Sequence, residues 1–325
     1  MGHAHRLLTS TCPVALQESQ TMHACHFFAA RKLSATLVTA LLLGGLSWSA
    51  DAGPVLDRIR QTGKITLAYR ESSIPFSYLD ANKHPIGYTM DLCMKVTEAI
   101  RKNLAPKSIA IDYLKVTEFN QIDMIVQNKA DLECASTSNT TERREKVAFT
   151  IPHYITGTRF MVRADSTITD MRGFEGLTLV STYKTPSLEA IKRTNKERQL
   201  GISIMQANDH EQAAEMVEKG LADGFAMDDV LLYGVISSRA DPSKLKVVGK
   251  FLALEPLSIV MSKNDPELKA IVDDTMKQLI SSREAYAIYD RWFTKPIPPR
   301  NASLNIPMNY LLREMWKYPS DSAAF

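Results

Sequence analysis

The feature that most constrains the fold is an alternation of short apolar or β-branched runs with helical patterns, which occurs twice in series. In the first series, strand patterns lie at 65–68, 109–113 and 132–134, and helical patterns lie at 91–102 and 120–128. In the second, strand patterns lie at 158–162, 177–181, 203–206 and 224–227, with helical patterns from Ser187 and over 212–219. This order predicts an α/β fold in which neighbouring strands are parallel.

The two series also predict where a ligand binds. Open α/β sheets bind ligands at the carboxyl ends of their strands, so two such edges that face each other would form a cleft. Linkers are predicted at 152–157 and 254–256, and neither is rich in glycine or serine. Two short crossings predict a hinge between two domains. Beyond the second linker, a strand-like return at 257–262 precedes helical patterns at 266–281 and 283–293 and a proline-rich tail.

Composition excludes several classes of protein. The chain has 325 residues, of which 45% are apolar and 23% charged, so disorder, collagen and coiled coil are excluded. At roughly 100–200 residues per domain, this length predicts two domains. The 39 basic and 36 acidic residues give a net charge of +3, without a run of five like charges. We therefore expect no nucleic-acid partner.

Residues 1–52 have the pattern of a secretory leader. Arg31 and Lys32 precede an apolar stretch at 33–48, and Ala50 and Ala52 form an A-x-A cleavage site. The alternative is a short membrane anchor or a buried helix. We expect cleavage near Ala52 and a free protein in the periplasm, because no transmembrane pattern follows. A start at Met22 would give the leader an ordinary length, which N-terminal sequencing of the precursor would test.

Two cysteines, Cys93 and Cys134, remain after the leader. In an oxidising compartment they form either a disulfide or a buried thiol pair, and the sequence leaves both alternatives open.

The motifs of common enzymes are absent from the sequence. It contains no GxSxG, HExxH, CxxC, Walker or GxGxxG motif, and we expect neither a metal nor a cofactor. Two loops, 69–78 and 134–143, instead follow predicted strands and combine hydroxyl groups with an arginine. Arginine binds carboxylates through a planar fork, so these loops are candidates to bind an anion. The alternative is that they are solvated loops or helix caps.

Several short motifs then occur in a characteristic order. They are Arg70-Glu71-Ser72-Ser73, Gly87-Tyr88, the loop from Glu133 to Arg143, Asp209-His210, Met227-Asp228-Asp229, and Trp292-Phe293 before Pro296-Ile297-Pro298-Pro299. In this order, from Leu56 to Pro299, the chain resembles the periplasmic solute-binding proteins of polar amino-acid ABC importers, of the glutamate/aspartate type.

The resemblance implies a type II periplasmic binding protein-like fold with two α/β lobes, two hinge strands and a ligand in the interlobe cleft. Lobe 1 is expected at 53–155 plus 256–325, and lobe 2 at 156–255. The implied protein is a monomer without enzymatic activity. It captures a free amino acid and delivers it to a membrane permease with its ATPase.

The resemblance also implies a set of ligand-binding residues. In lobe 1, Arg70 and Ser72 belong to the RESS loop, Ser136 and Thr137 bind main-chain groups of the ligand, and Arg143 binds the α-carboxylate from a loop one residue longer than usual. In lobe 2, Thr182 and Thr185 donate hydroxyl hydrogen bonds, His210 faces the ligand and Asp228 binds the α-ammonium group. The alternative roles are structural: ion pairs for the arginines, loop capping for Ser136 and Thr137, an N-cap for Thr185.

Three positions depart from the pattern of the glutamate/aspartate receptors. Glu118 and Gln121 replace a serine and an arginine, and Tyr183 replaces a glycine. If Glu118 faces the side-chain pocket, it would repel an acidic ligand and favour a neutral or hydrogen-bond-donating one. Alternatively, Glu118 points outward or pairs with Arg70.

Two further functions stay open beside that of a glutamate/aspartate receptor. One is the same receptor with specificity for a neutral or other polar amino acid. The other is a periplasmic cyclohexadienyl or arogenate dehydratase on the same fold, with the carboxyl group of Glu118 as general acid.

Overall fold

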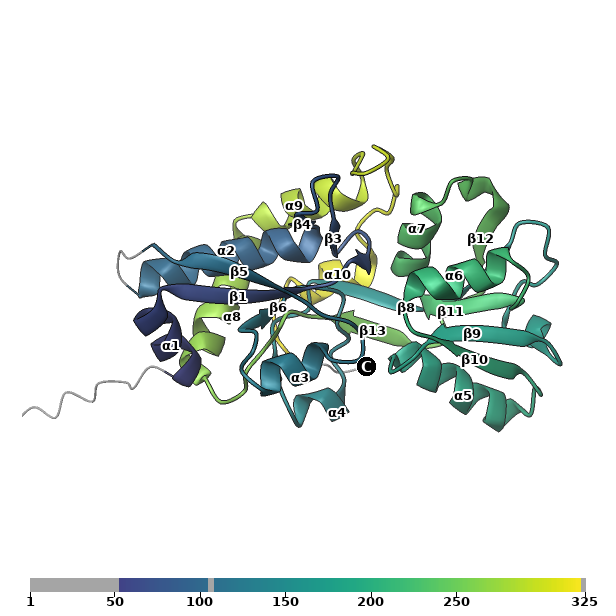
Figure 1. The fold of residues 1–325 in the computed structure, drawn as a ribbon, viewed down its shortest axis with the longest axis horizontal. Coiled ribbons are helices and arrows are strands. Elements are labelled where there is room, and N and C mark those ends of the chain that lie inside the picture. The colour runs from purple at the N-terminus through teal and green to yellow at the C-terminus, as the bar shows by residue number, and fades with distance from the viewer. Residues whose placement is uncertain (1–52, 105–107, 323–325) are drawn as a thin grey trace, which may run out of the picture. The chain divides into compact units, whose positions relative to one another are not determined.

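The computed structural model describes residues 53–104 and 108–322, which form two larger sheets with helices packed on them and one small sheet (Figure 1). The leader predicted at 1–52 lies outside the described residues. The strands of the first sheet, in spatial order, are β5 (Ala110–Lys115), β1 (Lys64–Tyr69), β6 (Leu132–Glu133), β14 (Val260–Met261) and β7 (Ala148–Phe149). β1 is parallel to both β5 and β6, whereas β14 is antiparallel to its neighbours.

Helices cover both faces of this first sheet because its inner strand β1 carries apolar side chains on both sides. Ile65 and Leu67 of β1 pack in one cluster of buried residues, and Ala68 packs in another. Figure 1 shows α2 and α9 on one side of the sheet and α3 and α4 on the other. The helices are α1 (Pro54–Thr62), α2 (Tyr88–Asn103), α3 (Gln121–Val126), α4 (Thr141–Arg144), α8 (Pro266–Ser281), α9 (Glu284–Phe293) and α10 (Tyr310–Met315). A small sheet of β2 (Ser72–Ser73), β3 (Ser77–Leu79) and β4 (Pro85–Ile86) precedes α2.

The second sheet repeats the parallel arrangement. Its spatial order is β10 (Ser203–Ala207), β9 (Thr178–Thr182), β11 (Gly224–Asp228), β8 (Tyr154–Arg163) and β12 (Leu245–Val248). β9 is parallel to β10 and β11, and β8 is antiparallel to β11 and β12. Its helices are α5 (Pro186–Arg198), α6 (His210–Glu218) and α7 (Asp229–Ser238), with 3₁₀ turns at Met171–Phe174 and Pro242–Lys244.

Two antiparallel strands connect the sheets. The first four residues of β8 pair with β13 (Leu254–Leu257), and the last four pair with β12 of the second sheet. Figure 1 shows β8 and β13 between the two sheets. Gly157 lies in this crossing, where a Cβ atom would come within 2.6 Å of the Ala253 carbonyl oxygen. The backbones of the two connections therefore approach too closely for any other residue at this position.

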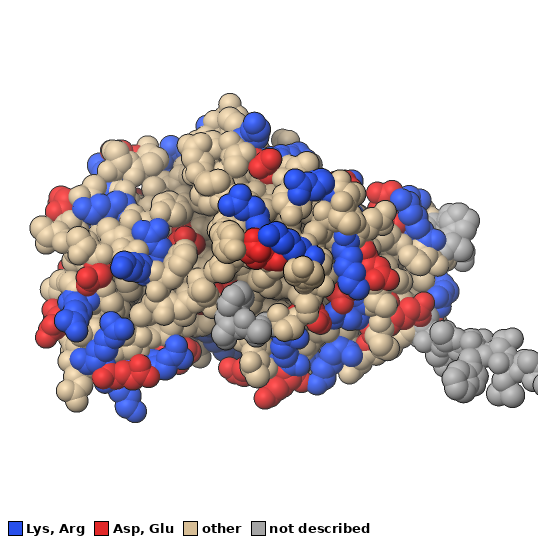
Figure 2. Space-filling view, turned by 180° about the vertical axis from the view of Figure 1, so that it is seen from behind, with Lys and Arg blue, Asp and Glu red and all other residues tan. Residues whose placement is uncertain are grey.

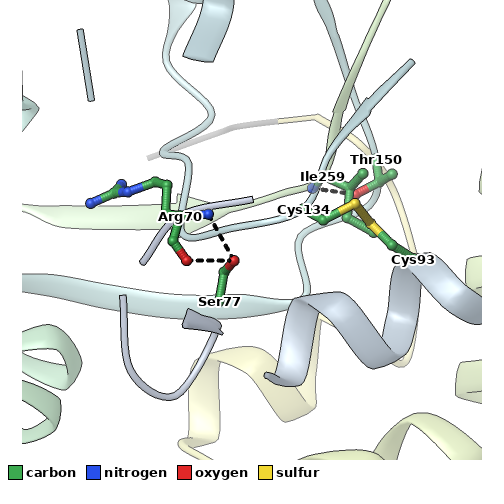
Figure 3. The surroundings of a disulfide bond; sticks show 6 residues. All are labelled: Arg70, Ser77, Cys93, Cys134, Thr150 and Ile259. Atoms are coloured by element: carbon green, nitrogen blue, oxygen red, sulfur yellow. Dashed lines mark hydrogen bonds between the residues drawn. A yellow bond between two sulfur atoms is a disulfide. The ribbon is translucent and has the colours of Figure 1, made fainter. Parts of the chain in front are cut away.

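A disulfide joins Cys93 of α2 to Cys134, which directly follows β6 (Figure 3). Of the two alternatives that the sequence left open, the structure therefore has the disulfide. The bond ties α2 to the start of the loop that carries Ser136 and Thr137, and both cysteines are fully buried.

The surface carries both signs of charge without segregation. Figure 2 shows basic and acidic side chains interspersed over the face that it presents. Over residues 53–104 and 108–322, no helix combines the length and the apolar character that a membrane span needs.

Candidate functional site

The predicted site residues follow strands of the two sheets. Arg70 follows β1, and the loop with Ser136 and Thr137 follows β6. In the second sheet, Thr182 ends β9 and Asp228 ends β11. These are the carboxyl ends of parallel strands, at which α/β sheets position ligand-binding groups.

Arg70 is held by its own hairpin. Its backbone N–H donates to the Ser77 hydroxyl at 2.9 Å, and that hydroxyl lies 3.1 Å from the Arg70 carbonyl oxygen (Figure 3). The side chain is buried, and Nη2 forms an ion pair with Glu118 and lies 2.8 Å from His210 Nε2. Burial lowers the pKa of Arg70 to about 10, so the guanidinium stays charged at neutral pH.

His210 links Arg70 to the second sheet. It is the first residue of α6, it is fully buried, and its Nδ1 lies 2.8 Å from the Thr182 hydroxyl. A guanidinium can only donate, so Nε2 accepts from Arg70 and the ring proton resides on Nδ1. Burial and the charge of Arg70 lower the pKa of His210 well below its ordinary value, which keeps the ring neutral.

Glu118, in the turn that leads into α3, and Gln121, the first residue of α3, are both buried. The Thr117 N–H donates to the Asn120 side chain at 2.8 Å, and the Gln121 N–H donates to the Thr117 carbonyl at 3.0 Å. Of the alternatives for Glu118, the structure has the pairing with Arg70. Glu118 Oε1 also lies 3.2 Å from His210 Nε2. The side chains of Arg70, Glu118 and His210, called the Arg70 cluster below, join the two sheets.

A second group of contacts begins at Arg143. Its Nη1 donates to the Ser138 carbonyl at 2.9 Å and its Nη2 donates to the Lys184 carbonyl, across from the first sheet to the second, at 3.4 Å. Arg143 has no carboxylate within 4.0 Å in the part of the chain that the structure describes. The Ser138 hydroxyl in turn donates to Glu255 Oε2 at 2.5 Å.

From Glu255 the contacts continue to Asp228. Glu255 Oε1 lies 3.4 Å from the Thr158 hydroxyl, which lies 2.9 Å from the Ser187 hydroxyl. Ser187 donates to Asp228 Oδ1 at 3.3 Å. Burial raises the pKa of Asp228 well above its ordinary value and also raises that of Glu255. A cation placed beside either carboxylate would stabilise its ionised form.

Sequence reasoning missed four residues of this second group: Ser138, Thr158, Ser187 and Glu255. Thr158 and Glu255 lie on the two strands that connect the sheets. They carry no motif, and only the pairing of β8 with β13 brings them beside residues distant in the sequence.

Several buried polar atoms near these two groups have no hydrogen-bond partner among the described residues. They are Arg70 Nε, Gln121 Oε1, both Glu133 carboxylate oxygens, Ser136 Oγ, Thr137 Oγ1 and Asp228 Oδ2. Each unpaired buried group costs about 1–3 kcal/mol. A small polar molecule could thus meet cationic donors as well as anionic acceptors, and these groups come from both sheets.

Three other predicted residues take different positions. Ser72 is half-buried in β2, where it pairs with Tyr78. The Thr185 hydroxyl accepts from Leu188 N–H at 3.2 Å and donates to the Thr182 carbonyl at 2.7 Å, so it is committed to the N-cap of α5. Tyr183 is partly exposed, and its ring centroid lies 4.6 Å from that of Phe119. Phe119 lies in the turn before α3, which packs on the first sheet.

The sequence matches the bacterial extracellular solute-binding proteins, family 3, over residues 65–295. The chain is 34% identical over 297 residues to the glutamate/aspartate import solute-binding protein of Salmonella typhimurium, covering 90% of this chain and 98% of that protein. It is 36% identical over 296 residues to the L-glutamate/L-aspartate-binding protein of Pseudomonas aeruginosa, covering 91% and 98%.

Solved structures with the same fold include other amino-acid-binding proteins. An ancestral arginine-binding protein bound to arginine has a TM-score of 0.63 at 19% identity, covering 71% of this chain and 98% of that one. The ancestral amino acid-binding protein AncCDT-1, a precursor of cyclohexadienyl dehydratase, has a TM-score of 0.61 at 23% identity, covering 73% and 98%. The predicted two-lobed, type II fold is therefore confirmed.

Proposed function

Because the chain belongs to family 3 of the bacterial extracellular solute-binding proteins, we propose that it is the periplasmic receptor of an amino-acid ABC importer. It captures a free polar amino acid and delivers it to the membrane permease. The names of its relatives from Salmonella typhimurium and Pseudomonas aeruginosa support an amino acid as the solute. The leader pattern at 1–52 supports export and cleavage near Ala52.

One observation carries this proposal: an unpaired carboxylate oxygen and an arginine without a carboxylate partner lie at the two ends of one chain of contacts. Asp228 Oδ2 has no partner and Arg143 donates only to backbone carbonyls, in each case among the residues described. An α-amino acid has an ammonium group for Asp228 and a carboxylate for Arg143. The hydroxyls of Ser136 and Thr137 supply further donors for the carboxylate.

We propose that lobe 1 comprises residues 53–155 plus 256–325 and lobe 2 residues 156–255, with β8 and β13 as hinge strands. Arg143, Ser136 and Thr137 then belong to lobe 1, whereas Asp228 and His210 belong to lobe 2. A ligand that contacts both lobes favours the closed arrangement by the free energy of the contacts it makes only there.

The test is calorimetric titration of the purified exported protein with each proteinogenic amino acid, after unfolding and refolding to remove carried-over ligand. We expect at least one polar amino acid to bind. The variant Asp228→Asn should bind it at least 100-fold more weakly, because the ammonium group loses its counter-ion. The control variant Asp274→Asn removes an exposed carboxylate of α8 and should bind normally. Failure of every amino acid to bind would refute the proposal.

A separate turnover assay with prephenate and arogenate tests the enzymatic alternative. The carboxylate of Glu118 is already engaged in a buried ion pair with Arg70, so it is not free to protonate a substrate. We therefore expect no conversion of prephenate or arogenate to an aromatic product. Turnover of either compound would overturn the assignment as a receptor without enzymatic activity.

A further inference from the structure

We propose that Glu118 determines specificity, by making the receptor select an amino acid with a carboxamide side chain over one with an acidic side chain. This inference rests on the proposed function and names the class of solute within it. It follows from the charge around Arg70 and from the hydrogen-bonding atoms that the Arg70 cluster leaves unpaired.

The two arginines of the site differ in their partners. Arg143 donates to the carbonyls of Ser138 and Lys184 and meets no carboxylate within the described ranges. Arg70 already forms an ion pair with Glu118, and both side chains are only 4% exposed. The carboxylate that every amino acid carries is therefore matched by Arg143. Asp228, at the far end of the same chain of contacts, matches the ammonium group. The Arg70 cluster, which is the other group of buried contacts between the two sheets, is then left for the ligand side chain.

The Arg70 cluster has no positive charge left for an acidic side chain. Glu118 neutralises Arg70, and His210 is neutral because it accepts from the guanidinium and its pKa is depressed. A ligand carboxylate here would lie beside the Glu118 carboxylate in a site closed to solvent. Two like charges repel much more strongly in such a site than in water. Glutamate and aspartate are therefore disfavoured.

The unpaired atoms in and beside the Arg70 cluster are best matched by a ligand group that both accepts and donates hydrogen bonds. Arg70 Nε carries a buried N–H without a partner, and Gln121 Oε1 is a buried acceptor without one, as far as the described residues extend. A carboxamide matches both, because its oxygen accepts from Arg70 and its NH₂ donates to Gln121 or Glu118. A carboxylate has acceptors only.

The experiment measures the dissociation constants of glutamine, asparagine, glutamate and aspartate by calorimetric titration of the refolded wild-type protein. We expect one of the two amides to bind at least 10-fold more tightly than its acid counterpart. The variants are Glu118→Ser, which frees Arg70, and Glu118→Gln, which removes the charge but keeps the size. Both should reduce the amide-to-acid ratio at least 10-fold, mainly by tightening the binding of the acid.

Glu71→Gln is the matched control. It removes the exposed carboxylate next to Arg70 in the sequence, which pairs with Lys115 at the surface. It should leave the ratio unchanged, and urea unfolding of each variant checks that it folds.

The outcomes separate the inference from the proposed function. Tighter binding of glutamate or aspartate by the wild-type protein would overturn the inference and leave the receptor function intact. The same holds if only a basic or aliphatic amino acid binds, or if folded Glu118 variants keep the wild-type ratio. Absence of binding by any amino acid would refute the proposed function itself.

Discussion

Reduction of the disulfide between Cys93 and Cys134 should destabilise the protein strongly without disabling the site. The two cysteines are 41 residues apart, and closing a loop of this length in the unfolded chain corresponds to about 4 kcal/mol of stability at 25 °C in the chain-entropy description. Both sulfur atoms are buried, so the reduced protein retains a thiol pair that still packs. We therefore expect the free energy of unfolding to fall by about 3–4 kcal/mol.

The binding loop after Cys134 should keep its position in the reduced protein. The Cys134 N–H donates to the Ala68 carbonyl at 2.9 Å, and the Ser258 N–H donates to the Thr137 carbonyl at 3.0 Å. These backbone hydrogen bonds hold Ser136 and Thr137 independently of the sulfur atoms. We expect the affinity for the solute to change by less than about threefold, which corresponds to less than about 0.7 kcal/mol.

The assay is urea unfolding of the refolded protein, followed by circular dichroism with and without reductant, together with titration of the solute under both conditions. The double variant Cys93→Ser/Cys134→Ser is the control, because reductant should not alter its unfolding curve. Unfolding free energies that agree within 1 kcal/mol before and after reduction would refute the argument from loop closure. A large loss of affinity at unchanged stability would refute the argument that backbone hydrogen bonds hold Ser136 and Thr137 in place.

Two further predictions concern other contacts of the site. Tyr183→Gly removes an aromatic ring whose centroid lies 4.6 Å from that of Phe119, across the two sheets. Because such aromatic pairs contribute about 0.5–1.5 kcal/mol, we expect the solute to dissociate roughly 2- to 10-fold faster in stopped-flow measurements. An unchanged dissociation rate would contradict this role of Tyr183. Burial raises the pKa of Glu133 to about 7, whereas its ordinary value is 4.5. A carboxyl group with a raised pKa in the folded state destabilises the fold as pH rises from 4.5 to 7, by about 3 kcal/mol here. Urea titrations should therefore show that Glu133→Gln gains stability relative to the wild type between pH 5 and pH 8, and a constant difference between the two would exclude Glu133 as the titrating group.

Much of the fold is predictable from the sequence because its strands and helices have regular apolar patterns. The helix predicted at 266–281 is α8 (Pro266–Ser281), and the strand predicted at 109–113 is β5, shifted by one or two residues. The helix α7 (Asp229–Ser238) was not predicted. It contains the consecutive buried residues Val230, Leu231 and Leu232, so it lacks the periodic alternation of an amphipathic helix.

The site was predictable only in part, for a physical reason. Arg70 and Asp228 were identified because they follow strand patterns within recognisable motifs. The partner of Glu118 was not predictable, since a choice between solvent and Arg70 depends on the packing of two loops that are 48 residues apart in the sequence. The contact between Ser138 and Glu255 spans 117 residues and has no local signature.

The placement of Thr158 and Glu255 on β8 and β13 has a consequence for engineering. The same two strands carry part of the polar contacts of the site and form the connection between the sheets. If β8 and β13 are the hinge strands, as proposed above, we expect a substitution at either position to alter solute affinity and domain motion together. Because the proposed selectivity residue Glu118 lies away from the crossing, we expect that a fluorescent sensor built from this scaffold could be changed in selectivity there while the crossing strands are left intact.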